Sequence, residues 1–210
     1  MKQGQEQRRA KGSAQPSDVP ARLLDATISV LDAAGPESAT SRTIADVADE
    51  NLASITYYFG SKRQLVHEAM VIAARRLIQP VVAEFAHDER DSITKLSRAV
   101  QQLYRILDAH RSLLGPYVHS LAAATTNDAI ATDVRSLHRE LRSVLAAEIS
   151  IQQHQGLLPN WVEPDSMAHL IVSLVNGVAV SLAIDPEEAQ PTALGSQFAQ
   201  LLLAVRAPTQ

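Results

Sequence analysis

The stretch of residues 40–62 constrains the fold of this chain more than any other part of its 210 residues. Thr40 is a good helix N-cap, because its hydroxyl can accept a hydrogen bond from a free N–H group of the first turn. The apolar residues Ile44, Val47 and Ala48 follow at helical spacings of three and four, so we predict that they form one packing face. The pattern predicts a short helix whose polar amino end stays accessible.

A second short helix is predicted directly after this one. Asn51 is a good N-cap, and Ile55 and Phe59 lie four residues apart, so both should pack inward. Gly60 is suited to end the helix. The opposite face carries two tyrosines, a serine and an alanine, which suit a surface that meets base edges and phosphates in a major groove.

A third helix is predicted to begin at once. Ser61 and Gln64 form a capping-box pattern, so Lys62 lies in the first turn of this helix. There its ammonium group and the free backbone N–H groups could both bind a phosphate. Two short helices, a tight turn and a phosphate-binding helix start are together typical of a DNA-reading unit.

This unit resembles the helix-turn-helix of the tetracycline-repressor (TetR) family of bacterial transcriptional regulators. The resemblance is carried by Ile44-Ala45 in the first helix, Tyr57-Tyr58-Phe59 in the second, and Ser61 and Lys62 after it. A predicted upstream helix over residues 21–34, ending at Gly35, is similar to the first helix of the family. The resemblance is strong over residues 19–77 and only architectural beyond them.

The turn of this unit departs from the family pattern. Asp49 and Glu50 stand where the family usually has Gly-Val, and Tyr58 stands where it commonly has His. Without the glycine, Asp49 must adopt a positive φ itself, or the turn must differ. Two acids near the DNA face could also weaken nonspecific affinity.

The pattern and the resemblance together indicate a set of DNA contacts. They are Thr40, Ser41, Arg42, Leu52, Ala53, Ser54, Thr56, Tyr57, Tyr58 and Lys62. Arg42 is the first candidate for a base contact, because a guanidinium can bind guanine through two hydrogen bonds, and a phosphate contact is the alternative. Leu52 is ambiguous, because periodicity places it on the face of Ile55 while its family position lies near DNA.

The whole chain is predicted to be all-α, because no segment has a strand pattern. Residues 1–18 form a flexible basic arm, either an inert tail or an arm that enters a minor groove. Residues 19–78 form a three-helix DNA-binding domain with the helix-turn-helix. Residues 79–210 form a C-terminal helical bundle for ligand binding and dimerisation.

Apolar periodicity and helix breakers divide this bundle. Pro80 is expected to kink or stop the helix that starts at Lys62, and Gly115-Pro116 is expected to force a turn. Helices are then predicted around residues 93–107, 117–124, 130–149, 164–184 and 192–205.

The last two helices carry more apolar surface than one small bundle needs to cover. The resemblance implies that they form a four-helix interface in a homodimer, and the alternative is that they face the protomer's own core. A two-fold dimer would also double the DNA site that one short recognition helix can read. The candidate interface residues are Leu170, Leu174, Val178, Phe198, Leu201 and Leu202.

The resemblance also implies a small-molecule pocket among the middle helices. Its polar or aromatic lining could come from Tyr104, His110, Tyr117, His119, His138, Arg142 and Trp161. For each of these the alternative is a surface residue or a satisfied polar group of the core. The aliphatic surroundings favour a largely apolar effector, whose carboxylate an arginine or histidine could bind.

Catalytic and metal-binding functions find no support in the sequence. No two histidines have the i, i+4 spacing of a helical metal site, and there is no phosphate-binding glycine loop or nucleophile elbow. Glu140 and Glu148 share a predicted helix, and we interpret them as part of a solvated face rather than as an acid–base pair. We therefore expect no enzyme activity, no cofactor and no metal.

Composition and length limit the location of the chain. The absence of cysteine excludes disulfides and thiol catalysis and suits a reducing compartment. No signal peptide is apparent, and the apolar run 170–184 is too short for a membrane span and is broken by Asn176. The net charge of −4 argues against a general nucleic-acid coat. We expect a cytoplasmic protein with no membrane partner.

These observations predict a ligand-responsive transcriptional regulator. It would bind a palindromic operator in double-stranded DNA as a homodimeric repressor, and a small, largely apolar effector would release it. The alternative is a helical ligand-binding or protein-interaction module on the same scaffold that does not bind DNA.

Overall fold

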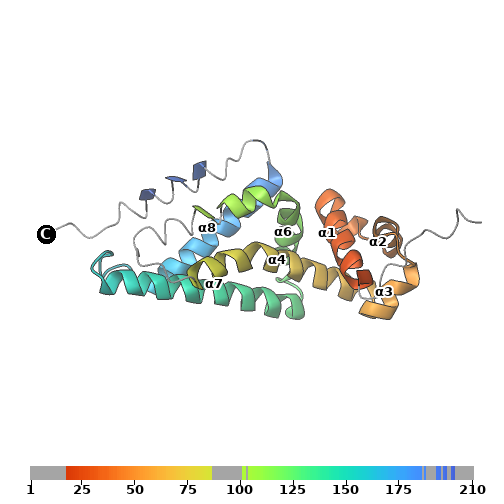
Figure 1. The fold of residues 1–210 in the computed structure, drawn as a ribbon, viewed down its shortest axis with the longest axis horizontal. Helices are drawn as coiled ribbons and strands as arrows, with labels where there is room; N and C mark the ends of the chain where they lie inside the picture. Colours follow the sequence, from red (N-terminus) through yellow and green to blue (C-terminus); the bar gives the residue numbers. More distant parts are fainter. Residues whose placement is uncertain are drawn as a thin grey trace, which may run out of the picture.

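The structure is a computed structural model that describes residues 18–86, 101–102 and 104–185, without the side chains of residues 84–86, and a few isolated positions from 187 to 201. Within this part of the chain every regular element is a helix (Figure 1). The elements are α1 (Val19–Ser38), α2 (Ser41–Ala48), α3 (Leu52–Phe59), α4 (Lys62–Ala86), the 3₁₀ helix η2 (Arg111–Leu113), α6 (Leu114–Ala123), α7 (Asp128–His154) and α8 (Pro164–Ile184). The predicted all-α fold is confirmed.

The N-terminal helices α1–α3 form one end of the molecule, and α4 leads from them into the bundle of α6, α7 and α8 (Figure 1). α4 packs against both α6 and α7, and α7 packs along α8. The C-terminal half of α1 lies on α6 and η2, so the two parts of the molecule share one continuous apolar core. α4 runs without interruption across residue 78, where the sequence suggested a domain boundary.

The helix-turn-helix follows the predicted capping chemistry. The Thr40 hydroxyl accepts a hydrogen bond from the Thr43 N–H group at 3.1 Å, and the Asn51 side chain accepts one from the Ala53 N–H group at 2.8 Å. Asp49 ends α2 in the left-handed region with φ 51°, which is the first of the two alternatives for a turn without glycine. Gly60 ends α3 with φ 72°.

The prediction for the packing face of α2 is wrong at one position. Ile44 and Ala48 are buried, but Val47 is 54% exposed, and Ala45 is buried in its place. At 100° per residue, Ala45 and Ala48 lie to one side of Ile44, whereas Val47 lies about 60° to the other side. A two-turn helix buries only a narrow stripe, and Val47 falls outside it. In α3, Ile55 is buried and Phe59 packs partly buried on the core, as predicted.

At three predicted helix breakers the structure differs from the predictions. α1 does not end before Gly35 but continues to Ser38 after a break at Gly35, where φ is 73°. α4 does not stop at Pro80 but continues to Ala86; Pro80 is exposed, so water can reach the carbonyl that loses its partner. α6 begins at Leu114, with Gly115-Pro116 inside its first turn, where a proline lacks only an N–H that would be unpaired anyway.

Gly115 allows the close contact between α1 and α6. A Cβ atom at this position would lie 3.2 Å from Asp32 Oδ1 and 3.3 Å from Asp32 Cα. Gly177 in α8 is different, because a Cβ atom there would meet nothing within 4 Å in the protomer. The glycine in α6 therefore sets how closely the N-terminal helices approach the bundle.

Among the described helices, α8 is long and apolar enough to cross a membrane by length and composition alone. The helix has 21 residues and is thus longer than the apolar run seen in the sequence. One such helix is weak evidence for a membrane span, because apolar helices of soluble bundles pass the same test.

Candidate DNA-binding surface and ligand-domain cluster

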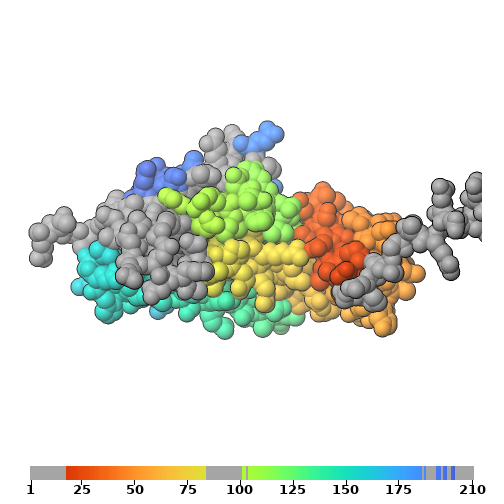
Figure 2. All heavy atoms as spheres, in the orientation of Figure 1, coloured from red at the N-terminus to blue at the C-terminus, as the bar shows by residue number. Residues whose placement is uncertain are grey.

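The outer face of α3 is open, and it lies at the end of the molecule formed by α1–α3 (Figure 2). Tyr57 is 81% exposed, and Ala53, Thr56 and Tyr58 are exposed beside it, while Ser54 is half-buried. The rings of Tyr57 and Tyr58 stand edge to face, with centroids 4.8 Å apart. This contact limits the freedom of two large side chains that would otherwise have to be ordered on binding.

Leu52 belongs to this outer face. It is 50% exposed, whereas Ile55 is buried against the core. Leu52 is the first residue of α3, where the helix has just left the turn and has little core beneath it. The exposure of Leu52 is therefore compatible with the position near DNA that the resemblance implies.

The amino end of α2 lies at the same end of the molecule as α3 and carries hydroxyl side chains and one arginine. The Thr40 hydroxyl is engaged at the cap, where it also lies 2.8 Å from the Thr43 hydroxyl, and Ser41 is half-buried. Arg42 is exposed and forms no ion pair with any residue that the structure describes. Its guanidinium is therefore available to a base or a phosphate.

The start of α4 carries half of the predicted capping box. The Ser61 hydroxyl accepts a hydrogen bond from the Gln64 N–H group at 3.2 Å. The Gln64 side chain does not return to the cap but donates to Glu68 Oε1 at 3.1 Å. The first-turn residue Lys62 is exposed, as expected for a phosphate contact.

The ion-pair partner of Glu50 could not be predicted from the neighbouring residues in the sequence. The Arg22 guanidinium of α1 donates to Glu50 Oε1 through Nε at 2.9 Å and also through Nη2. The Glu50 side chain is only 13% exposed, so its charge is largely neutralised within the fold. The expected repulsion of DNA by two acids therefore applies to the exposed Asp49 rather than to Glu50.

In the bundle the structure brings together two of the seven predicted pocket residues. The Tyr117 hydroxyl of α6 lies 3.0 Å from His138 Nε2 of α7 and donates to Asn176 Oδ1 of α8 at 2.6 Å. Asn176 appeared in the sequence only as a break in an apolar run, and its partners are far away along the chain. We call these three residues the Tyr117 cluster; it joins three helices through one hydroxyl group.

Burial determines the protonation states in the Tyr117 cluster. Burial raises the pKa of Tyr117, so the phenol stays protonated and donates its proton to Asn176. His138 Nε2 must then supply the proton of its own hydrogen bond to the Tyr117 oxygen. Burial lowers the pKa of His138, and the positive charges of Arg142 and His169 lower it further. The imidazole is therefore neutral at pH 7, with Nδ1 as an acceptor.

The other predicted pocket residues are spread over different environments. Tyr104 is buried, His119 and Arg142 are half-buried, and His110 is exposed. Trp161 is 71% exposed in the segment between α7 and α8. The prediction of a solvated face for Glu140 and Glu148 is wrong for Glu148, which is 4% exposed and accepts a hydrogen bond from Gln152 at 3.1 Å. Glu140 is exposed and binds Gln79 of α4.

The described part of the predicted dimer surface is accessible in the protomer. Leu170 and Leu174 of α8 and Leu201 are exposed, and Val178 is half-buried. The side chains of Phe198 and Leu202 lie outside the described residues. Exposed leucines on an apolar helix are suited to a second helical surface, and the interface stays a prediction.

Two family models match the chain. Residues 23–69 match the model for bacterial regulatory proteins of the tetR family, and residues 92–205 match the model for the C-terminal part of BetI-type transcriptional repressors. The second match covers more than half of the chain. No curated protein sequence was found to match.

Solved structures share the fold over most of the chain at low sequence identity. A transcriptional regulator of Saccharomonospora viridis in complex with choline aligns with a TM-score of 0.77 and 18% identity, covering 91% of this chain and 99% of that chain. FadR of Bacillus halodurans, a fatty acid degradation regulator, aligns with a TM-score of 0.74 and 18% identity, covering 91% and 97%. FadR of Bacillus subtilis in complex with stearoyl-CoA gives 0.72 and 14%, covering 88% and 97%.

The family models and the shared fold agree with the helix-turn-helix and the helical bundle that the structure describes. The chain belongs to the TetR family of bacterial transcriptional regulators, with a tetR-type DNA-binding region and a C-terminal region of the BetI type.

Proposed function

We propose that this protein is a homodimeric repressor that binds a palindromic operator in double-stranded DNA and is released by a small, largely apolar effector. α3 enters the major groove, and the two recognition helices of the dimer read successive half-sites. The protein acts in the cytoplasm, without catalytic activity.

The observation that carries the DNA-binding part is the chemistry of the open end of the molecule. Tyr57, Arg42 and Lys62 extend from three different helices that are adjacent in the chain, and none of them is buried. Arg42 reads a base or grips a phosphate, and Lys62 binds a phosphate at the start of α4. The other proposed contacts are the exposed Leu52, Ala53, Thr56 and Tyr58, the half-buried Ser41 and Ser54, and the capping residue Thr40.

The proposal of an apolar effector rests on the middle of the bundle. The Tyr117 cluster provides polar groups among apolar helices, and the neutral His138 keeps Nδ1 as an acceptor that a donor on a ligand could use. Related folds have been solved with choline and with stearoyl-CoA, two ligands that differ widely in size and charge. The same fold therefore accommodates chemically different ligands, so the ligand class depends on the local side chains. The buried residues of α7 and α8 beside the cluster are mostly aliphatic.

Regulation requires that the effector prefers one of two conformations. α4 connects Lys62 at the DNA surface to a long contact with α7 in the bundle, and α6 connects the Tyr117 cluster to α1. An effector that shifts α6 or α7 would move the reading helices as well. Equal affinity for both conformations would leave DNA binding unchanged.

DNase footprinting on the intergenic DNA beside the gene of this protein tests the proposal. We expect a protected two-fold symmetric site, and we expect protection to decrease when an apolar effector is added. A protein that forms a dimer but protects no sequence on this DNA would favour a ligand-binding or protein-interaction module instead.

A further inference from the structure

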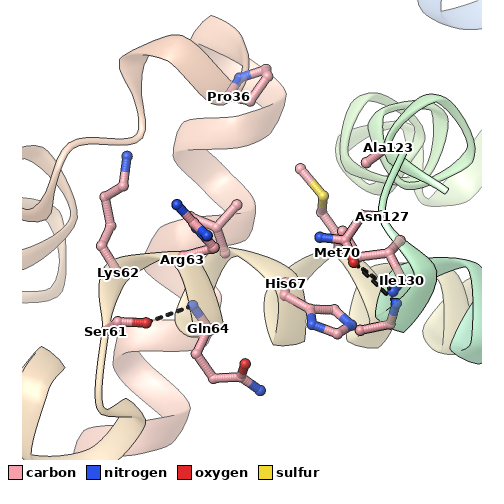
Figure 3. A pocket seen from close by; sticks show the side chains of 12 residues that line it. Pro36, Ser61, Lys62, Arg63, Gln64, His67, Met70, Ala123, Asn127 and Ile130 are labelled. Carbon is pink, nitrogen blue, oxygen red and sulfur yellow. Dashed lines mark hydrogen bonds between the residues drawn. The ribbon is translucent and has the colours of Figure 1, made fainter. Parts of the chain in front are cut away.

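A hollow lies between the two parts of the molecule, outside the Tyr117 cluster. It is lined on one side by Pro36 of α1 and the first turns of α4, and on the other by Ala123 of α6 and the start of α7 (Figure 3). Its volume is about 850 Å³, which is room for a small molecule. We call it the interdomain hollow.

The charged side chains that line the interdomain hollow are all basic. Lys62 and Arg63 line it, and both are exposed and form no ion pair with a residue that the structure describes. No aspartate or glutamate is among its lining residues. The third basic residue of the lining, His67, is already bound to Asp133 of α7, with 2.9 Å between Nε2 and Oδ2. Two cations are therefore available to an anion.

The floor of the interdomain hollow is apolar. Met70 and Ile130 are buried beneath it, and Val66 is half-buried beside them. In Figure 3 Lys62, Arg63 and Met70 extend from α4 toward the side on which Pro36 lies. A ligand whose anionic group binds the two cations would therefore place its neighbouring atoms over a short apolar surface of the protein.

We propose that the interdomain hollow binds a small amphipathic anion, whose carboxylate or phosphate lies between Lys62 and Arg63 and whose short apolar part lies over Met70 and Ile130. Arg63 is suited to bind either head group through two hydrogen bonds. The apolar part would cover surface that is otherwise hydrated. The site is separate from any effector site at the Tyr117 cluster.

Such a ligand would oppose DNA binding. Lys62 cannot bind the anion and a DNA phosphate at full strength at the same time, so each ligand lowers the affinity of the other by the same factor. A ligand that bridges α4 and α7 would also hold the reading helices at one angle to the bundle. This consequence rests on the proposed DNA-binding function, whereas the binding of the anion does not.

Isothermal titration calorimetry on the full-length protein without DNA tests the site. The probes are octanoate and monooctyl phosphate, which differ in the head group, and octyltrimethylammonium is the probe of opposite charge. We expect at least one anion to bind with a Kd on the order of 1 mM or tighter, and the cation not to bind.

Two variants locate the binding. Ala129→Trp places a large side chain in the interdomain hollow from an exposed position of α7, and Arg63→Gln removes one cation. Each should weaken the binding of the anion about tenfold or more. Ala147→Trp is the matched control, because Ala147 is an exposed alanine of α7 that does not line the hollow, and it should bind like the wild type.

The proposal is overturned if neither anion binds the wild type, or if Ala129→Trp and Arg63→Gln bind it as the wild type does. It is also overturned if the cation binds equally well. Since these titrations contain no DNA, their failure leaves the proposed repressor function standing. Conversely, a protein without an operator could still bind the anion at this site.

Discussion

Arg22 of α1 and Glu50 of the α2–α3 turn form an ion pair that joins the first helix to the helix-turn-helix across 28 residues of chain. Glu50 is the more buried partner, so its carboxylate depends on Arg22 for neutralisation. The pair therefore has a structural role in the helix-turn-helix, because it fixes the turn between α2 and α3 to α1.

Glu50→Ala should lower the free energy of unfolding by about 1–3 kcal/mol, because it leaves the Arg22 guanidinium partly buried without its acceptor. Urea unfolding followed by circular dichroism measures the change. Asp46→Ala, at an exposed acid of α2 outside this pair, is the control and should stay close to the wild type. Equal midpoints for Glu50→Ala and the control would show that the pair adds nothing.

Gly115→Val should destabilise the protein by about 1–3 kcal/mol, because the larger side chain cannot fit between α6 and Asp32 without moving α1. Gly177→Ala is the matched control, because in the protomer its Cβ meets open space and alanine favours a helix by up to about 1 kcal/mol. Thermal unfolding of both variants gives the comparison. A Gly115→Val protein as stable as the wild type would contradict the close contact of α1 and α6.

The stability of the protein should depend on pH through His138. The pKa of His138 is lowered in the folded state from its ordinary value of 6.5. At a pH below about 6.5 the unfolded state therefore binds more protons than the folded state does. The free energy of unfolding should therefore fall as the pH drops from about 6.5 toward the folded pKa, by at most ~1.4 kcal/mol per pH unit from this group.

His138→Gln should remove that part of the slope, which urea unfolding at several pH values measures. His110→Gln, at an exposed histidine, is the control for the loss of an imidazole. Parallel curves for His138→Gln and the wild type would mean that the cluster is not linked to protonation.

Leu174→Glu should convert the proposed dimer to a monomer, because it places a charge in the centre of the exposed apolar face of α8. Sedimentation velocity measures the change, and circular dichroism checks that the helices are kept. Ser136→Glu, at an exposed position of α7, should leave the assembly unchanged. A Leu174→Glu protein that sediments like the wild type would place any interface elsewhere.

The features that could be predicted from the sequence are those with local causes. Thr40, Asn51 and Gly60 act on backbone groups within a few residues. The two alternatives for the turn, a positive φ at Asp49 or a different turn, also followed from local chemistry, and the structure has the first. Long amphipathic helices such as α7 and α8 were predicted for the same reason, because their periodicity repeats over many turns.

The features that could not be predicted depend on distant partners. Nothing near Glu50 or Asn176 in the sequence indicates that Arg22 and Tyr117 will bind them. Glu148 is a charged residue of the kind that is usually exposed to solvent, but the packing of α7 buries it. Helix periodicity gives the direction of each side chain, whereas burial depends on which helices cover it.

The central claim, that the end of the molecule formed by α2, α3 and the start of α4 binds an operator, is tested most directly by titrating a labelled duplex that carries the footprinted site. Arg42→Ala should cost about 1–3 kcal/mol and relax the preference at one operator position, as expected for a base contact. Lys62→Ala should weaken all sequences alike and reduce the salt slope by about 1. Wild-type affinity, sequence preference and salt slope in both variants would contradict this account.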